Sequence, residues 1–216
     1  MGGRSRMWWV AGMAALVLFV AGCGDDDSSG GDSAASDAVE QSAGIFVGTV
    51  EGTDAYIAVV TEDPEPVTAF LTDGTPDRAP TVAVFLLGRV VDGTLDVSAP
   101  EAGPGSDVEV LGTVHAEEVT GNVYIADEPH PFTADAVEPP AGLYEQAGTQ
   151  AEDGRALSAG WVVAPDGTQR GALQWGLGEW RPAPMIDPTG TDDVVVASEA
   201  GDISVDYDQP GDEIFD

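Results

Sequence analysis

The chain contains no lysine, and its seven basic residues are all arginine, set against 39 acidic residues. Nucleic-acid phosphates and anionic lipid head groups both need basic contacts, so this charge balance argues against both as partners. A lone cysteine, Cys23, leaves no intramolecular disulfide to form. The two histidines, His115 and His130, lie fifteen positions apart without metal-ligand spacing. We therefore expect neither a zinc site nor a cofactor.

Sequence motifs of enzymes are also absent. The chain has no Gly-x-Ser-x-Gly elbow, no lysine nucleophile and no EF-hand calcium loop. Neighbouring carboxylates do not identify a glycosidase here, because with 39 acidic residues such pairs occur throughout the chain. A Ser-His-Asp triad that uses either histidine stays geometrically open, and it is the hydrolase hypothesis that we retain.

The first 22 residues have the layout of an export signal. Arg4 and Arg6 are the only charged residues before Asp25, and Met7 to Val20 is apolar apart from Gly12. This run is shorter than the roughly 20 residues of a spanning helix and has the length of a signal-peptide core. We therefore expect residues 1–22 to form a helical signal peptide.

The residues that end this run, Val20-Ala21-Gly22-Cys23, resemble the lipobox of bacterial lipoproteins. In that family the cysteine thiol carries a diacylglyceryl group and becomes the new N-terminus after cleavage. The resemblance implies that Cys23 is lipidated and that acyl chains hold the protein at the extracytoplasmic face of the cell membrane. The alternatives are an ordinary signal peptide with a coincidental cysteine, or an uncleaved N-terminal helix.

Cleavage before Cys23 leaves five arginines against all 39 acidic residues, a formal charge of −34. Such a surface repels itself unless salt screens it, and molar salt shortens the Debye length to about 3 Å. Adaptation to high salt is one explanation of the acidity, and a moderately acidic exported protein in ordinary salt is the other. Residues 24–43 are mainly Ser, Gly, Ala and acidic residues, so 23–43 is expected to be a lipidated cysteine followed by a disordered linker.

From residue 44 onward, short apolar stretches alternate with Gly, Pro and Asp about every 8–12 residues, a pattern typical of all-β domains. The sequences Asp92-Gly93 and Pro165-Asp166-Gly167 are tight turns between apolar stretches. We expect one domain over 44–181 with about ten antiparallel strands, folded as an up-and-down barrel or a sandwich. The expected strands lie at 45–51, 55–61, 67–72, 81–91, 94–97, 108–114, 119–125, 131–137, 143–147, 155–164 and 168–175. The stretch 81–91 is almost continuously apolar, as a strand buried on both faces would be.

The segment 182–216 is an acidic tail with ten acidic residues and no basic one. Its apolar stretches 194–196 and 203–205 predict a late hairpin. The stretches 44–60 and 142–163 share a Gly-apolar-aromatic start and an Ala…Val-Val end, which indicates either a duplication or chance similarity between strands. The sequence from 44 to 175 also resembles small exported β-domains of high-GC Gram-positive bacteria. That resemblance supports the fold and implies no site residue.

Two sets of residues are candidates for binding. The loop around Asp73, Asp77 and Arg78 is the most distinctive polar segment, and it offers oxygen ligands for Ca²⁺ or a recognition surface. The alternative is a structural turn in which Arg78 pairs with Asp73 or Asp77. Trp161 and Trp175 are candidates for the mouth of a ligand-binding barrel, and core packing is the alternative for both.

These observations predict a lipid-anchored extracytoplasmic β-domain that binds an envelope component or a partner protein and has no catalytic role. A barrel that binds a small molecule at its mouth is the second hypothesis, and a hydrolase with an unrecognised site is the third. A cavity lined by Trp161 or Trp175 favours the second hypothesis, whereas a packed interior favours the first.

Overall fold

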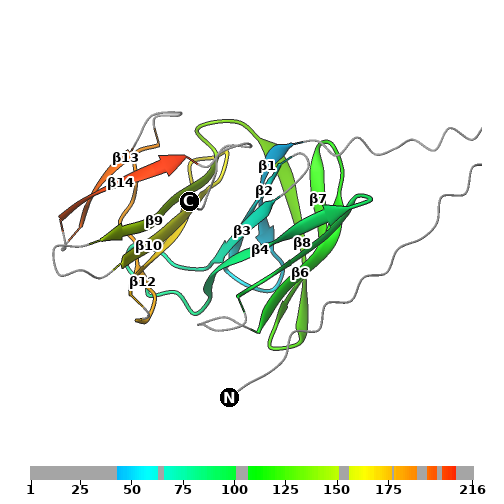
Figure 1. Cartoon of the computed structure of the whole chain (residues 1–216), viewed down its shortest axis with the longest axis horizontal. Coiled ribbons are helices and arrows are strands. Elements are labelled where there is room, and N and C mark those ends of the chain that lie inside the picture. Colours follow the sequence, from blue (N-terminus) through cyan, green and yellow to red (C-terminus); the bar gives the residue numbers. More distant parts are fainter. Residues whose placement is uncertain are drawn as a thin grey trace, which may run out of the picture. The chain divides into compact units, whose positions relative to one another are not determined.

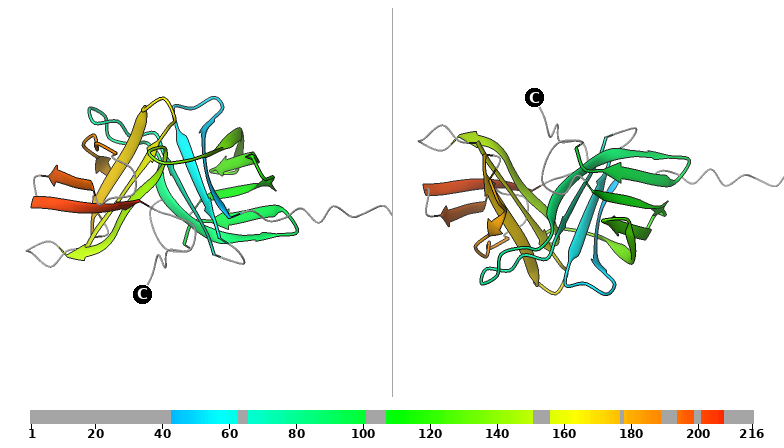
Figure 2. Two further views of the ribbon diagram at one scale, coloured as in Figure 1. Left: turned by 90° about the horizontal axis from the view of Figure 1, so that it is seen from above. Right: turned by 90° about the horizontal axis from the view of Figure 1, so that it is seen from below.

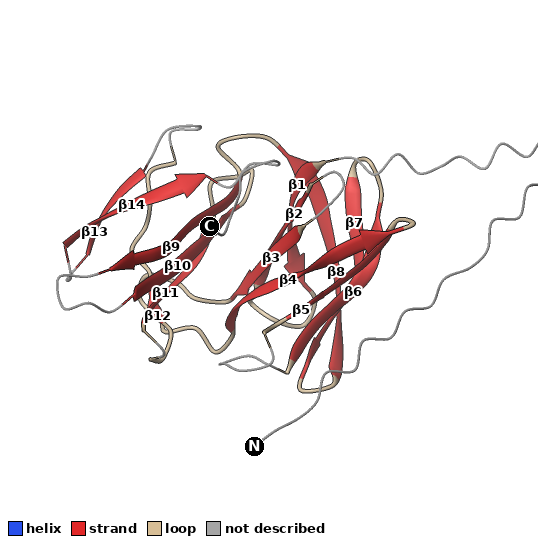
Figure 3. Ribbon diagram, in the orientation of Figure 1, coloured by secondary structure: helices blue, strands red, loops and turns tan. Residues whose placement is uncertain are grey.

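The computed structural model of the chain describes residues 43–62, 66–100, 107–150, 156–176, 178–188, 194–198 and 201–207. These residues form strands, turns and loops with no helix (Figure 3), so the all-β prediction is confirmed. No helix long and apolar enough to cross a membrane occurs among them. Cys23, the predicted signal peptide and all but the last residue of the predicted linker lie outside the described residues.

The described residues form fourteen strands, which fall into two sheets (Figure 1). The first sheet holds β1 (Gly44–Val50), β2 (Tyr56–Thr61), β3 (Val67–Thr72), β4 (Ala83–Val91), β5 (Thr94–Ser98), β6 (Val108–Val114), β7 (Glu118–Ile125) and β8 (Glu128–Val137). The second sheet holds β9 (Gly142–Gln150), β10 (Ala156–Val163), β11 (Gln169–Trp175), β12 (Arg181–Pro182), β13 (Val194–Ser198) and β14 (Gly201–Tyr207).

The first sheet is a closed antiparallel barrel in which every strand pairs with the next one along the chain. β8 closes the barrel by pairing with β1, from Ile45 opposite Val137 to Val50 opposite Phe132. The up-and-down barrel is one of the two predicted forms. All eight barrel strands overlap strands expected from the sequence, because turn residues separate their apolar stretches.

The barrel is filled by inward-facing side chains, which we call the barrel core. On β5, Leu95 and Val97 are 0% exposed, whereas Thr94, Asp96 and Ser98 are exposed, as expected of a strand with one dry face. All eight strands contribute buried apolar side chains, more than half of them valine. An eight-stranded barrel has an interior of the width that such side chains fill.

Glycines at inward positions let neighbouring strands approach closely. A Cβ at Gly48 would overlap the carbonyl oxygen of Thr133 on β8, and a Cβ at Gly88 would overlap that of Asp96 on β5. Only glycine permits this approach of one backbone to another, and glycine at such positions lets a sheet coil tightly. These residues therefore help the barrel to close with eight strands.

The second sheet has the strand order β12-β11-β10-β9-β14-β13. Its β10–β11 hairpin turns at 165–167, as predicted. β13 and β14 form the late hairpin expected within 182–216, and β14 joins β9 at Asp206 and Tyr207. Part of the predicted tail is therefore hydrogen-bonded into this sheet.

The second sheet packs against the outer face of β1, β2, β3 and the first half of β4 (Figure 2). The apolar side chains between the two sheets, which we call the inter-sheet core, include Ile45 and Phe70 from the barrel and Leu143 and Val162 from the second sheet. β2 and β3 are buried on both faces, because one face points into the barrel and the other into this layer.

Tyr144 fixes the start of the second sheet next to the connection from β8. Its hydroxyl donates a hydrogen bond to the carbonyl oxygen of Pro140 (3.1 Å). The residue is 0% exposed, and burial raises the pKa of Tyr144 to about 12. The phenol therefore stays protonated and donates at all physiological pH values.

The prediction that 81–91 is buried on both faces is correct only for the first half of this stretch. Ala83, Val84 and Leu86 are buried, whereas Leu87 is 39% and Val91 50% exposed. The second sheet packs against the beginning of β4, and the rest of the strand extends past it into solvent. The apolar sequence of β4 does not indicate where this packing ends.

Candidate functional site

The loop between β3 and β4 holds the candidate residues Asp73, Asp77 and Arg78. Asp73 is only 6% exposed. Its Oδ1 accepts hydrogen bonds from the backbone N–H groups of Thr81 (2.7 Å) and Val82 (3.1 Å), and its Oδ2 accepts one from the Thr81 hydroxyl (2.6 Å). The Asp73 carboxylate therefore holds the two ends of the loop together.

Arg78 forms two ion pairs in this loop. Its Nη1 lies 3.2 Å from Oδ2 of Asp54, and its Nη2 lies 3.8 Å from Oδ2 of Asp73 while donating to the Asp73 carbonyl oxygen (3.0 Å). This Asp73–Arg78 pairing corresponds to the structural alternative for the loop, and Asp77 lies exposed at the turn. Within the part of the chain that the structure describes, no three His, Cys, Asp or Glu side chains form a group that could hold a metal ion.

The same loop contacts β11 beside the two residues, Ala172 and Leu173, that pair with the short edge strand β12. The carbonyl oxygen of Gly74 accepts a hydrogen bond from the N–H of Gly171 (3.1 Å), and a Cβ on Gly74 would overlap the Gly171 carbonyl. Arg170 donates from Nε to the carbonyl oxygen of Asp54 (3.4 Å) and lies over the Tyr56 ring, 4.8 Å from its centroid. An unpaired strand edge invites aggregation, so this contact protects β11. The loop thus joins the barrel to the second sheet.

Trp161 and Trp175, the candidate mouth residues, belong to the second sheet. Trp161 is 1% exposed and its Nε1–H donates to the carbonyl oxygen of Pro184 (2.8 Å). A Cβ at Gly171 would meet its indole ring, so this glycine makes room for the side chain. Trp175 is partly buried against the same apolar cluster. Gly160, the residue before Trp161, faces the barrel, so Trp161 points to the opposite face of the second sheet, where the segment around Pro184 packs on it.

Trp180 completes an aromatic cluster on the outside of the barrel. Its ring centroid lies 6.2 Å from that of Phe70 and 6.3 Å from that of Phe85, whose own centroids are 4.3 Å apart. Gly160 of β10 faces both phenylalanine rings, and a Cβ there would come within 2.8 Å of each. Tilted aromatic contacts of this kind add to the stability of the inter-sheet core.

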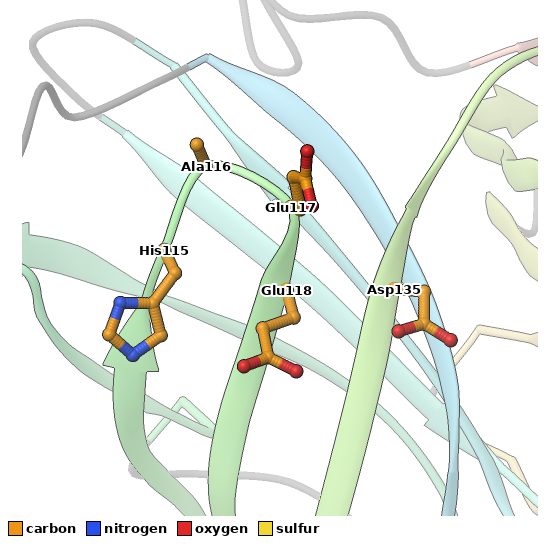
Figure 4. Close-up of a pocket in the computed structure, with 5 residues that line it drawn as sticks. All are labelled: His115, Ala116, Glu117, Glu118 and Asp135. Carbon is orange, nitrogen blue, oxygen red and sulfur yellow. The ribbon is translucent and has the colours of Figure 1, made fainter.

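An open hollow of about 500 Å³ lies outside the barrel at the turn from β6 to β7. It is lined by His115, Ala116, Glu117, Glu118 and Asp135 (Figure 4). The N–H of His115 donates to the Glu118 carbonyl oxygen (2.8 Å), and Glu118 lies directly opposite Asp135 on β8. Three carboxylates therefore share this hollow with one imidazole, and no serine lines it.

A row of threonines crosses the outer face of the barrel where the second sheet does not cover it. Thr94 lies opposite Thr113, Thr113 opposite Thr120, Thr120 opposite Thr133, and Thr133 opposite Thr49, so that five neighbouring strands each contribute one. We call these five residues the threonine row. Four of them are exposed, and Thr120 is half-buried.

The threonine row was not predicted from the sequence. Each of its residues alternates with buried positions, and so each can be assigned to an outer face from the sequence. The alternation does not say which residues on different strands lie opposite one another. That information comes from the register, which a sequence pattern does not contain.

Comparison of the chain with protein-family models, with curated proteins and with solved structures finds no match. Its function is therefore inferred from the residues of this chain and from their positions in the fold.

Proposed function

We propose that this chain is a lipoprotein, held at the extracytoplasmic face of the cell membrane by lipid on Cys23, that binds an envelope component with the outer surface of its barrel. The packed barrel core is the observation that supports binding by the outer surface. A small-molecule site inside the barrel would need a cavity of about 300–1,000 Å³. Because side chains fill the barrel, we assign recognition to its outer surface.

The proposed lipid anchor rests on the sequence at 20–23 and on the charge of the chain. With five arginines against 39 acidic residues beyond residue 22, anionic head groups repel the folded part. Two acyl chains give stable attachment where one gives only marginal binding. The proposal therefore assigns membrane attachment to lipid on Cys23 and recognition to the folded part.

The placement of the other candidate residues supports this proposal over the two alternatives. Trp161 is buried on the second sheet, on the face away from the barrel, and so lines no mouth of the barrel; this removes the residue that suggested a ligand-binding barrel. His115 shares its hollow with three carboxylates, and His130 lies on β8 opposite Val123. The hydrolase hypothesis therefore gains no argument from His115.

Replacing Cys23 tests the anchor directly. In cells that express the full chain, Cys23→Ala should move the protein out of the membrane fraction, or block its maturation, and should abolish labelling by an alkyne analogue of palmitate. The matched control is Ser28→Ala, which alters the same segment and should leave both properties unchanged.

A Cys23→Ala protein that still sediments with membranes and is processed normally would contradict the anchor. A wild-type chain that takes up no acyl label in a lipoprotein-processing host would do the same. Neither result depends on what the barrel binds.

A further inference from the structure

The threonine row has a regular spacing that is set by the barrel. Each of its residues sits next to a barrel-core residue in the sequence, so all five side chains point outward; these neighbours are Val50, Leu95, Val114, Val119 and Phe132. Neighbouring strands lie about 4.8 Å apart, and side chains directly opposite each other have Cβ atoms about 5 Å apart. Each of the five strands in the row therefore presents one hydroxyl and one methyl group on the outer face of the barrel.

The row is uncharged in a chain that is otherwise dense in acids. On one side, two residues along β7 and β8, lie Glu118 and Asp135 of the acidic hollow. On the other side, two residues along β5, lies the exposed Asp96, with Arg89 of β4 opposite it. An anionic polymer on the row would meet the carboxylates of Glu118 and Asp135, and repulsion of like charges disfavours it. The five threonines themselves carry no charge, so the row suits an uncharged partner.

The chemistry of the row fits a partner rich in hydroxyl groups. A threonine hydroxyl donates one hydrogen bond and accepts two, so it suits a partner that both donates and accepts. Its β-branched side chain has few rotamers, so little side-chain freedom is lost on binding. Asn122, two residues from Thr120 on the same face, adds an amide group.

We propose that the threonine row binds a neutral polysaccharide of the cell envelope. A polysaccharide offers repeated hydroxyl groups without charge, which is the complement of a repeated row of threonines between flanking acids. The inference rests on the proposed function, because the lipid anchor is what brings the row within reach of such a polymer. The competing explanation is that threonine pairs merely stabilise the sheet, and the experiment must separate the two.

The test uses the full chain, purified in detergent, in native affinity gels that contain dextran, mannan or arabinogalactan, with the anionic polymer alginate for comparison. The test variant carries Thr113→Val, Thr120→Val and Thr133→Val, which removes three hydroxyls and keeps the side-chain shape and the strand propensity. The control variant is Ser98→Val, on the same outer face of β5 but outside the row. The melting temperature of each variant is measured alongside.

We expect at least one neutral polysaccharide to retard the wild-type chain, and the triple variant to bind it at least about tenfold more weakly. Ser98→Val should bind as the wild type does, and alginate should retard none of the proteins. All variants should keep a melting temperature close to that of the wild type. Added salt should leave the retardation unchanged, because no ion pair is formed.

Three results would overturn the proposal: no retardation of the wild type by any of the three neutral polymers, equal retardation of the triple variant, or preferential binding of alginate. Fractionation of cells that express the triple variant keeps this test apart from that of the anchor. Membrane attachment of the triple variant should equal that of the wild type. If the Cys23→Ala protein stays in the membrane fraction while the threonine row binds polysaccharide, the lipid anchor is wrong and polysaccharide binding stands.

Discussion

Single buried polar residues hold the connecting segments of this protein in place. Gln169 is 8% exposed and makes two hydrogen bonds to the backbone of Ile186, donating from Nε2 to its carbonyl oxygen (2.9 Å) and accepting at Oε1 from its N–H (3.1 Å). Asp73 does the same for the β3–β4 loop through Thr81 and Val82. In both cases one side chain supplies backbone partners that no neighbouring strand provides.

The role of Asp73 predicts a difference in stability between two neighbouring acids. Asp73→Ala should lower the free energy of unfolding by about 1–3 kcal/mol, because it removes a buried carboxylate that accepts three hydrogen bonds from Thr81 and Val82. Asp77→Ala, at an exposed position of the same loop, should change it by less than about 0.5 kcal/mol. Urea unfolding of both variants measures the difference, and equal effects would show that the Asp73 hydrogen bonds do not hold the loop.

At the scale of strands, the barrel depends on the closest contacts between neighbouring backbones. Gly48→Ala should destabilise the fold by about 1–3 kcal/mol or more, because the added methyl overlaps the carbonyl of Thr133 and pushes β1 away from β8. Gly44→Ala, on the same strand, is the control, since its Cβ would meet only the ring of Phe46 at 3.3 Å. Thermal unfolding of the two variants compares them, and a Gly48→Ala protein as stable as Gly44→Ala would contradict the coiling argument.

The sequence predicted the strands well, because each strand carries its own signal. Turn residues such as Asp92-Gly93, and the alternation of Leu95 and Val97 with polar residues, are signals that depend only on residues close together in the sequence. Closure of the barrel was left open between two forms, because it depends on β8 meeting β1 about ninety residues away. The stretches 44–60 and 142–163 each form an antiparallel hairpin in their own sheet, which agrees both with a duplication and with chance similarity between strands.

The candidate site was predicted less well, and the reason is again distance along the chain. Asp73, Asp77 and Arg78 stood out because charged residues cluster there, but no local pattern predicts that Gly171 of β11 binds this loop. Trp161 stood out as a large aromatic residue, and its burial depends on the segment around Pro184, more than twenty residues further along the chain. The threonine row combines residues from five strands, so only the register assembles it.

On the scale of the whole molecule, the excess of acids predicts a strong response to salt. Raising sodium chloride from low to molar concentration should raise the melting temperature steeply, because screening reduces the repulsion among 39 acidic residues that face only seven arginines. Sucrose at equal osmolality is the control, since it favours compact states without screening charge. A melting temperature that does not change with salt would count against adaptation to high salt.

The way the chain enters the barrel has a mechanical consequence. The preceding segment joins β1 at Gly44, and β1 is hydrogen-bonded along both sides, to β2 and to β8. A force applied to the chain before residue 44 therefore runs along β1 and loads two ladders in shear at once. Both sets of hydrogen bonds must break together before the strand can slide. If lipid on Cys23 anchors the chain, as we propose, a barrel closed in this manner keeps its fold when the membrane pulls on it.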